Sequence, residues 1–133
     1  MSPTASTFTV ASAQTFVGAG YDLVTTFDWL HDMGGPMGAA RHIREAISQD
    51  GTWLIVEPKA GDTLIDNLNS LGRLAYSFST FLCVPNALSQ EGGYSLGAQA
   101  GEEPIRRLAT DAGYSGFRRV AETPFNIVYE ARP

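Results

Sequence analysis

Two segments decide the fold: YDLVTTF at residues 21–27 and TWLIVE at residues 52–57. Each is a nearly continuous apolar run, which is typical of a strand that has both faces covered. Between them, small and apolar residues recur at helical spacing from Met37 to Gln49, and Pro36 stands at the first-turn position. A strand, a helix and a strand within about forty residues predict two parallel strands joined by a right-handed crossover.

Further elements are expected on either side of this unit. The patterns predict a strand at Thr7–Ala11, helices at Leu64–Leu82 and Glu102–Ala112, and a closing hairpin of Gly116–Ala121 and Phe125–Ala131. Pro85 is expected to end the first of these helices, because the residue before a proline avoids helical geometry. This order predicts an α/β fold, with helices over the faces of a mostly parallel sheet and an antiparallel C-terminal strand.

The composition is that of a globular protein with one core. The 133 residues are 44% hydrophobic and 17% charged, which predicts a single domain over residues 1–133. The net charge of −5 argues against a broad nucleic-acid surface. Cys83 is the only cysteine, which excludes an internal disulfide and a four-thiolate zinc site. No signal peptide or membrane span is evident, so a cytoplasmic location is expected.

Candidate functional residues follow the strands, because ligands bind beyond the carboxyl ends of strands in such sheets. The positions concerned are Ser12–Gln14, Asp28–Met33 and Glu57–Lys59. His31 can serve as an acid, a base or a metal ligand, or it can be a hydrogen-bonded histidine at a strand–helix corner. Local sequence alone favours the second interpretation. Glu57 can bind substrate, act as a base or cap the following loop.

Other candidates have simpler interpretations. His42 is expected on the solvated face of a helix, and a zinc site using both His31 and His42 is discounted because they lie on different elements. We therefore expect no metal site. Cys83 ends an apolar helix and is expected to pack. Gly18-Ala19-Gly20 precedes a strand, so it does not fit a dinucleotide-binding loop. The aromatic residues Tyr76, Phe78 and Phe81 lie on a core helix or line a hydrophobic acceptor pocket.

Several motifs together resemble the later half of class I S-adenosylmethionine-dependent methyltransferases. They are YDLV at 21–24, LHDM at 30–33, DGTWLIVEP at 50–58, DAGYSGF at 111–117 and PFNIVYEARP at 124–133. The resemblance covers nearly the whole chain from about Phe8, and is closest to bacterial enzymes with an N-terminal winged-helix-like region. It implies a partial Rossmann-like sheet, S-adenosylmethionine as cofactor and a small, partly apolar methyl acceptor.

The resemblance also implies roles for individual residues. Cofactor-binding residues would be Ser12, Ala13, Phe27, Asp28 and Trp29; catalytic residues would be His31 and Glu57; acceptor-binding residues would be Asp32, Tyr76 and Phe81. Ser12 stands where the family often has an aspartate. The family's first strand, glycine loop and second strand have no counterpart here. We therefore expect a truncated or split enzyme, whose cofactor binding by this chain alone is weakened.

The resemblance makes the strand Tyr21–Phe27 an expected interface. The family's first strand would lie beside it, so its apolar edge needs a cover. That cover would be Thr7–Ala11, the same strand of a second copy in a homodimer, or a complementing chain. Two alternatives remain: a non-catalytic structural or regulatory module, and a small-molecule-binding domain that uses the Tyr76–Phe81 helix and the glycine-rich segment after Ser89.

Overall fold

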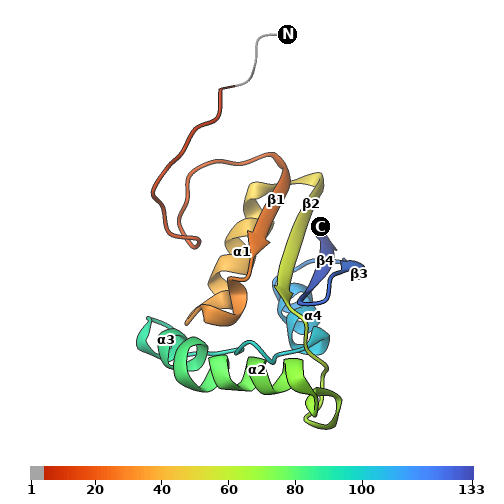
Figure 1. The fold of residues 1–133 in the computed structure, drawn as a ribbon. Helices are drawn as coiled ribbons and strands as arrows, with labels where there is room; N and C mark the ends of the chain where they lie inside the picture. Colours follow the sequence, from red (N-terminus) through yellow and green to blue (C-terminus); the bar gives the residue numbers. More distant parts are fainter. Residues whose placement is uncertain (1–4) are drawn as a thin grey trace.

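A four-stranded sheet forms the centre of the fold (Figure 1). The structure is a computed structural model and describes residues 5–133. The strands are β1 Tyr21–Phe27, β2 Ile47–Pro58, β3 Gly116–Glu122 and β4 Asn126–Arg132, in the spatial order β1-β2-β4-β3. Strand β1 pairs in parallel with β2, whereas β4 pairs antiparallel with both β2 and β3. Within the described residues β4 alone is reversed, which confirms the predicted sheet and its closing hairpin.

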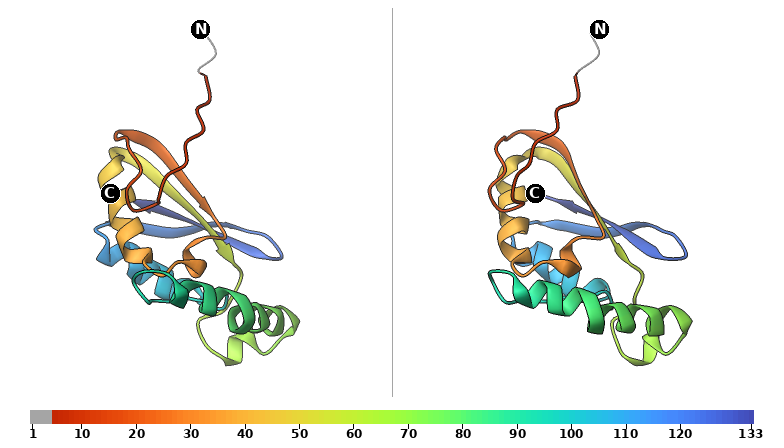
Figure 2. Two further views of the ribbon diagram at one scale, coloured as in Figure 1. Left: turned by 90° about the vertical axis from the view of Figure 1, so that its left-hand side faces the viewer. Right: turned by 60° about the vertical axis from the view of Figure 1, so that its left-hand side comes forward.

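Two helices cover one face of this sheet (Figure 2). They are α1, Pro36–Ala46, and α4, Glu102–Asp111. Pro36 lies in the first turn of α1, where its missing N–H leaves no helical hydrogen bond unmade. Gly113 follows α4 with a φ of 99°, a backbone conformation that favours glycine and ends the helix as predicted. In the described part of the chain, no helix combines the length and apolar character needed to cross a membrane.

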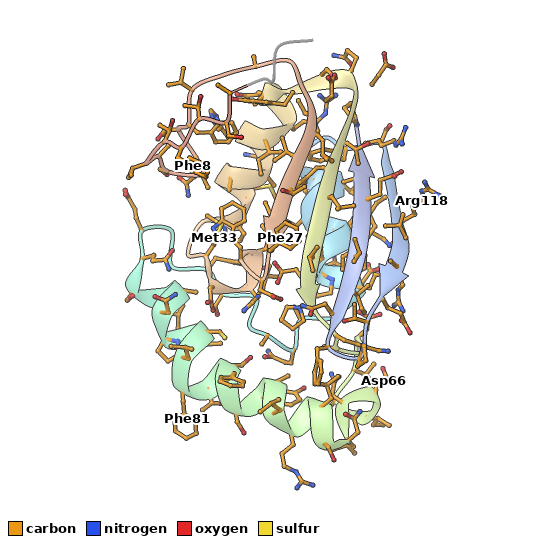
Figure 3. All side chains as sticks on the ribbon, turned by 45° about the horizontal axis from the view of Figure 1, so that its top comes forward. Phe8, Phe27, Met33, Asp66, Phe81 and Arg118 are labelled. Carbon is orange, nitrogen blue, oxygen red and sulfur yellow. The ribbon has the colours of Figure 1, made fainter. Side chains whose placement is uncertain are left out.

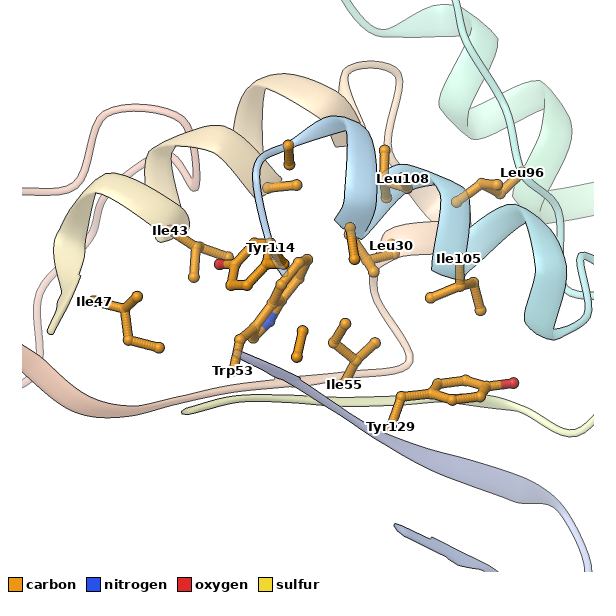
Figure 4. Close-up of a cluster of buried hydrophobic side chains, with 14 of the residues drawn as sticks. Leu30, Ile43, Ile47, Trp53, Ile55, Leu96, Ile105, Leu108, Tyr114 and Tyr129 are labelled. Atoms are coloured by element: carbon orange, nitrogen blue, oxygen red, sulfur yellow. The ribbon is translucent and has the colours of Figure 1, made fainter. Parts of the chain in front are cut away.

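The main core lies between this face and the two helices (Figure 4). Trp53 and Ile55 of β2 and Tyr129 of β4 are almost fully buried beneath α1 and α4. The indole Nε1 of Trp53 donates a hydrogen bond of 3.1 Å to Thr26 Oγ1 of β1. Because side chains alternate along a strand, Glu57 lies on the same face as Trp53 and Ile55. The core therefore ends in a buried carboxylate.

The opposite face of the sheet has no helix over it (Figure 2). Leu54, Val56 and Val128 are half-buried there, and on β1 the side chains of Leu23 and Phe27 are 56% and 64% exposed. The prediction that both faces of β1 are covered is therefore wrong for this chain. The physical reason is its place in the sheet, because β1 is an edge strand with one neighbour among the described residues.

The predicted strand at Thr7–Ala11 is wrong, because these residues are irregular and exposed and do not pair with β1. The chain attaches to α1 only further along. Gln14 Nε2 donates to the carbonyl oxygen of Gly35 at 3.1 Å, and His42 Nε2 lies 2.8 Å from the carbonyl oxygen of Phe16. His42 is thus a half-buried anchor for this segment, where a solvated histidine was expected. The edge of β1 is left open.

A helical segment passes beneath the carboxyl ends of β1 and β2 (Figure 1). It consists of η2 Ile65–Asn67, α2 Ser70–Phe78, the π-helical turn η3 Ser79–Cys83 and α3 Val84–Ser89. The prediction that Pro85 ends the helix is wrong. The helical backbone instead continues from the π turn through Val84 and Pro85 into α3, so the irregular winding of the π turn lies directly before the proline. The glycine-rich segment that follows leads to α4 as a loop.

Candidate functional site

The candidate site is organised around Glu57, the last buried residue of β2. Its side chain is almost fully enclosed, and its carboxylate accepts three hydrogen bonds. Oε1 accepts the backbone N–H groups of Trp29 at 3.1 Å and Leu30 at 2.8 Å. Oε2 lies 2.6 Å from Nδ1 of His31. Glu57 therefore fixes both the turn η1, Leu30–Asp32, and the orientation of the imidazole ring.

His31 is buried, yet its environment favours the protonated ring. Burial acts to lower the pKa of the imidazole, but the hydrogen bond and negative charge of Glu57, with further attraction from Asp32 and Asp28, outweigh it. The net result is a pKa above the ordinary 6.5. Because Nδ1 faces Glu57, Nε2 is the nitrogen left for other chemistry, and it lies 3.6 Å from Asp32 Oδ1.

A cavity of about 320 Å³, the His31 pocket, opens beside this ring. Its polar wall includes Asp28, His31 and Asp32, and its apolar wall comes from α2 and η3. The apolar side chains from those two elements are Leu71, Leu74, Ala75, Phe78 and Leu82. A pocket with a few polar groups at one end of an apolar wall suits a small, partly apolar ligand that carries one polar group.

Asp28 stands at the junction of β1 and the pocket. Its φ of 46° makes it the one described residue other than glycine in the left-handed region, a conformation that aspartate tolerates better than most side chains. Asn126 Nδ2 of β4 donates to Asp28 Oδ1 at 2.7 Å and so holds the strained residue. Burial, with repulsion from Glu57, raises the pKa of this carboxyl above its usual value. Asp28 thus adds a second carboxylate to the His31 pocket.

The structure separates the three expected acceptor-binding residues. Asp32 lines the His31 pocket, whereas Tyr76 and Phe81 do not. Phe81 is 85% exposed and points away from the sheet (Figure 3). The pocket is lined by the apolar stripe at helical spacing, Leu71, Ala75, Phe78 and Leu82, and Tyr76 and Phe81 lie off this stripe. The π turn that follows α2 buries Ser79 and Cys83. Phe78, the third aromatic residue that the sequence offered for an acceptor pocket, does line the His31 pocket, together with Leu82 of the same apolar helical stripe.

The expected cofactor-binding residues divide between two cavities. Ala13, Phe27 and Trp29 line a cavity of about 440 Å³ between the N-terminal segment, β1 and α1, here called the Trp29 pocket. Asp28 faces the His31 pocket instead. Ser12 lies in an exposed turn, where its Oγ accepts the backbone N–H of Gln14 at 3.2 Å. Three of the five residues therefore share one largely apolar cavity.

Sequence patterns did not predict that Asn126 and Cys83 belong to the site. Asn126 is 98 residues from Asp28 along the chain, and only the reversed pairing of β4 with β2 brings them together. Cys83 reaches the His31 pocket because the π turn aims it inward. The Pro-Phe-Asn sequence at 124–126 and a cysteine on an apolar helix have no local pattern that would have placed them here.

Comparison with known proteins identifies this arrangement. No family profile matches the sequence, and no curated protein matches it. The crystal structure of TnmH matches 96% of this chain with a TM-score of 0.73 and 18% identity. Human N-acetylserotonin methyltransferase, solved in complex with S-adenosylmethionine, matches 94% with a TM-score of 0.68 and 20% identity. An O-methyltransferase family protein from Burkholderia thailandensis matches 91% with a TM-score of 0.62 and 20% identity.

This chain has the class I methyltransferase fold. Its sheet and helices correspond to part of the three solved structures named above. The chain covers 35%, 33% and 33% of the three matched chains, so it spans about a third of their length. The expected resemblance is confirmed at the level of the fold, and the roles of individual residues stay predictions.

The raised pKa of His31 predicts a pH-dependent contribution to stability. A group whose pKa is higher in the folded state stabilises the fold fully below its unfolded pKa, and this stabilisation is lost as pH rises through the folded pKa. The advantage in unfolding free energy of the wild type over His31→Gln should therefore shrink between about pH 6 and about pH 9. Urea denaturation at the two pH values measures it, and an advantage that grows with pH would contradict this environment for His31.

Proposed function

We propose that this chain forms the acceptor side of an S-adenosylmethionine-dependent O-methyltransferase that acts on a small, partly apolar hydroxyl compound. The observation that carries the proposal is the His31–Glu57 pair, with Nδ1 and Oε2 2.6 Å apart, because His31 lines the His31 pocket while Glu57 is buried behind it. The fold shared with human N-acetylserotonin methyltransferase and with an O-methyltransferase family protein supports it. In this proposal residues 1–133 act as one domain, and the protein works in the cytoplasm.

His31 and Glu57 have the geometry of a proton-accepting pair. The hydroxyl proton of an acceptor in the His31 pocket would pass to Nε2, while Nδ1–H remains hydrogen-bonded to Glu57. Glu57 holds the ring in the tautomer that leaves Nε2 free, and it stabilises the imidazolium that forms. The apolar wall of the pocket positions the acceptor and excludes water. S-adenosylmethionine, when bound, supplies the electrophilic methyl group.

The residues present fit one part of this cofactor. The Trp29 pocket offers an apolar cavity, with Phe16 and Trp29 as aromatic walls, that suits a flat ring such as adenine. The ribose and the amino-acid part have no obvious anchor, because no glycine-rich loop follows a strand in the described residues. The proposal therefore gives this chain adenine contacts and assigns the remaining contacts to a further segment or chain.

The open edge of β1 is the proposed place where such a partner pairs. Its outward backbone groups lack a neighbouring strand within residues 5–133, and Leu23 and Phe27 are exposed beside them. An unpaired apolar edge favours association with another strand. We commit to a second copy of β1 as the partner of this chain in isolation, because a two-fold pair closes the edge of both copies at once.

Binding of S-adenosylhomocysteine tests the cofactor role. Calorimetry on the wild-type chain should detect binding tighter than about 1 mM, a free energy of about −4 kcal/mol. Trp29→Ala should abolish it by removing an aromatic wall of the Trp29 pocket. His31→Gln should leave it unchanged, because His31 does not line that pocket. If the wild type shows no binding, or if Trp29→Ala binds equally well, the fold assignment stands without the proposed function.

The oligomeric state tests the role of the β1 edge. Sedimentation should show a dimer for the wild type and a monomer for Leu23→Glu, because a charge on an apolar edge opposes strand pairing. Val120→Glu is the matched control, since Val120 is 40% exposed on β3, the other edge strand, and this variant should stay dimeric. A monodisperse wild-type monomer would refute this interface, as would equal behaviour of the two variants.

A further inference from the structure

We propose that His31, Asp32 and Cys83 bind a thiophilic divalent cation, with Zn²⁺ as the best fit. One nitrogen of His31, one carboxylate oxygen of Asp32 and Sγ of Cys83 all lie within 4.8 Å of one another. Two elements far apart in the chain, η1 and the π turn η3, bring them together. The sequence argument considered only a site with both histidines, and this site uses one. It does not depend on the proposed methyltransferase activity.

Neither His31 Nε2 nor Asp32 Oδ1 has a hydrogen-bond partner within residues 5–133. The imidazole of His31 is 9% exposed, and its Nε2 has no hydrogen-bond partner among the described residues, the nearest carboxylate oxygen being 3.6 Å away. That oxygen, Oδ1 of Asp32, is itself buried and without a partner in the same part of the chain. A buried oxygen without a hydrogen-bond partner thus lies close to the ring nitrogen of His31 that does not face Glu57. Such groups are costly unless a ligand completes them.

The surroundings of the three donors have the features of a metal site. Glu57 accepts the Nδ1–H of His31, and a carboxylate in this position commonly orients a metal-binding histidine and strengthens its free nitrogen. The carbonyl oxygen of Asp32 accepts hydrogen bonds from Gln90 Nε2 at 2.8 Å and Asn86 Nδ2 at 3.3 Å, which fix the backbone of that ligand. Cys83 projects from a π turn, a feature that often marks functional positions.

The donor set selects the class of cation. Nitrogen, oxygen and sulfur together suit zinc and related transition metals, whereas Mg²⁺ and Ca²⁺ prefer oxygen alone. Tetrahedral zinc with bonds of about 2.0–2.3 Å places its ligands about 3.3–3.6 Å apart, so the three groups need to close by about 1 Å. The fourth position faces the His31 pocket, which lies against all three residues. An open fourth position is typical of zinc that meets small molecules.

A cation at this place would affect the chemistry of His31. Zinc on Nε2 occupies the lone pair that the proposed proton-accepting role requires, so the two uses of His31 exclude each other.

Cobalt substitution tests the proposal without any methyltransferase assay. Co²⁺ added to the untagged, chelator-treated chain should bind once per chain and give a thiolate-to-cobalt charge-transfer band, which one equivalent of Zn²⁺ removes and excess Mg²⁺ does not. Cys83→Ser, which keeps the size of the side chain, should abolish the band. Asp32→Asn and Glu57→Gln should each weaken zinc binding about 10- to 100-fold.

His42→Gln is the control, because it removes the only other histidine and lies outside the cluster. This variant should keep the band and the zinc affinity of the wild type, and circular dichroism checks that every variant is folded. Absence of a saturable cobalt band in the folded wild type would overturn the proposal. Equal zinc affinity in Cys83→Ser and the wild type would do so as well, because binding would then lie elsewhere on the surface.

Discussion

The hydrogen bonds of the buried Glu57 carboxylate are the constraint on which the site depends. An ionised carboxylate in a protein interior is stable only when charges and hydrogen-bond donors compensate it. Glu57 obtains this compensation from two backbone N–H groups at the start of η1 and from the ring of His31. The same three bonds close the end of the core, shape the turn after β1 and aim His31 at its pocket. The carboxylate of Glu57 therefore both stabilises the fold and orients the candidate catalytic histidine.

The two faces of the sheet differ in what covers them. In residues 5–133, α1 and α4 cover one face, whereas the other face has no helix over it. Residues of α1 and α4 bury Trp53, Ile55 and Tyr129, and this core positions the carboxyl ends of β1 and β2. On the other side, Leu23 and Phe27 stay exposed at an unpaired edge. The complete part of the fold holds the His31 pocket and the open part borders the Trp29 pocket, which is why the proposed functions of the two pockets differ in what they require from a partner.

Local sequence patterns correctly predicted helices and strands that pack against other parts of this same chain. The helix after Pro36 and the closing hairpin follow from helical spacing, first-turn proline and alternating strands, and the structure confirms them. His31 and Glu57 were found because strand ends gather at one edge of a sheet. Their contact through Nδ1 and Oε2, however, depends on a parallel register that residue types do not specify.

The incorrect predictions have specific physical causes. Thr7–Ala11 has strand-forming residues but does not pair with the available edge of β1, and strand propensity depends on packing that this exposed segment does not have. Phe81 was proposed for the pocket because it is aromatic, although it lies off the apolar stripe of its helix. The π turn at Ser79–Cys83 has no sequence signature, so Cys83 was expected only to pack. Asp28 and Asn126 meet only through the order of the strands. Each missed contact joins distant parts of the chain.

A double-mutant cycle on Glu57→Gln and His31→Gln tests most directly whether this buried pair organises the site. The free energies of unfolding of the wild type, both single variants and the double variant would be measured near pH 6, where His31 carries its proton. Groups in direct contact couple by about 0.5–3 kcal/mol, and we expect a coupling of at least about 1 kcal/mol. A coupling indistinguishable from zero, with all four proteins folded, would contradict the account.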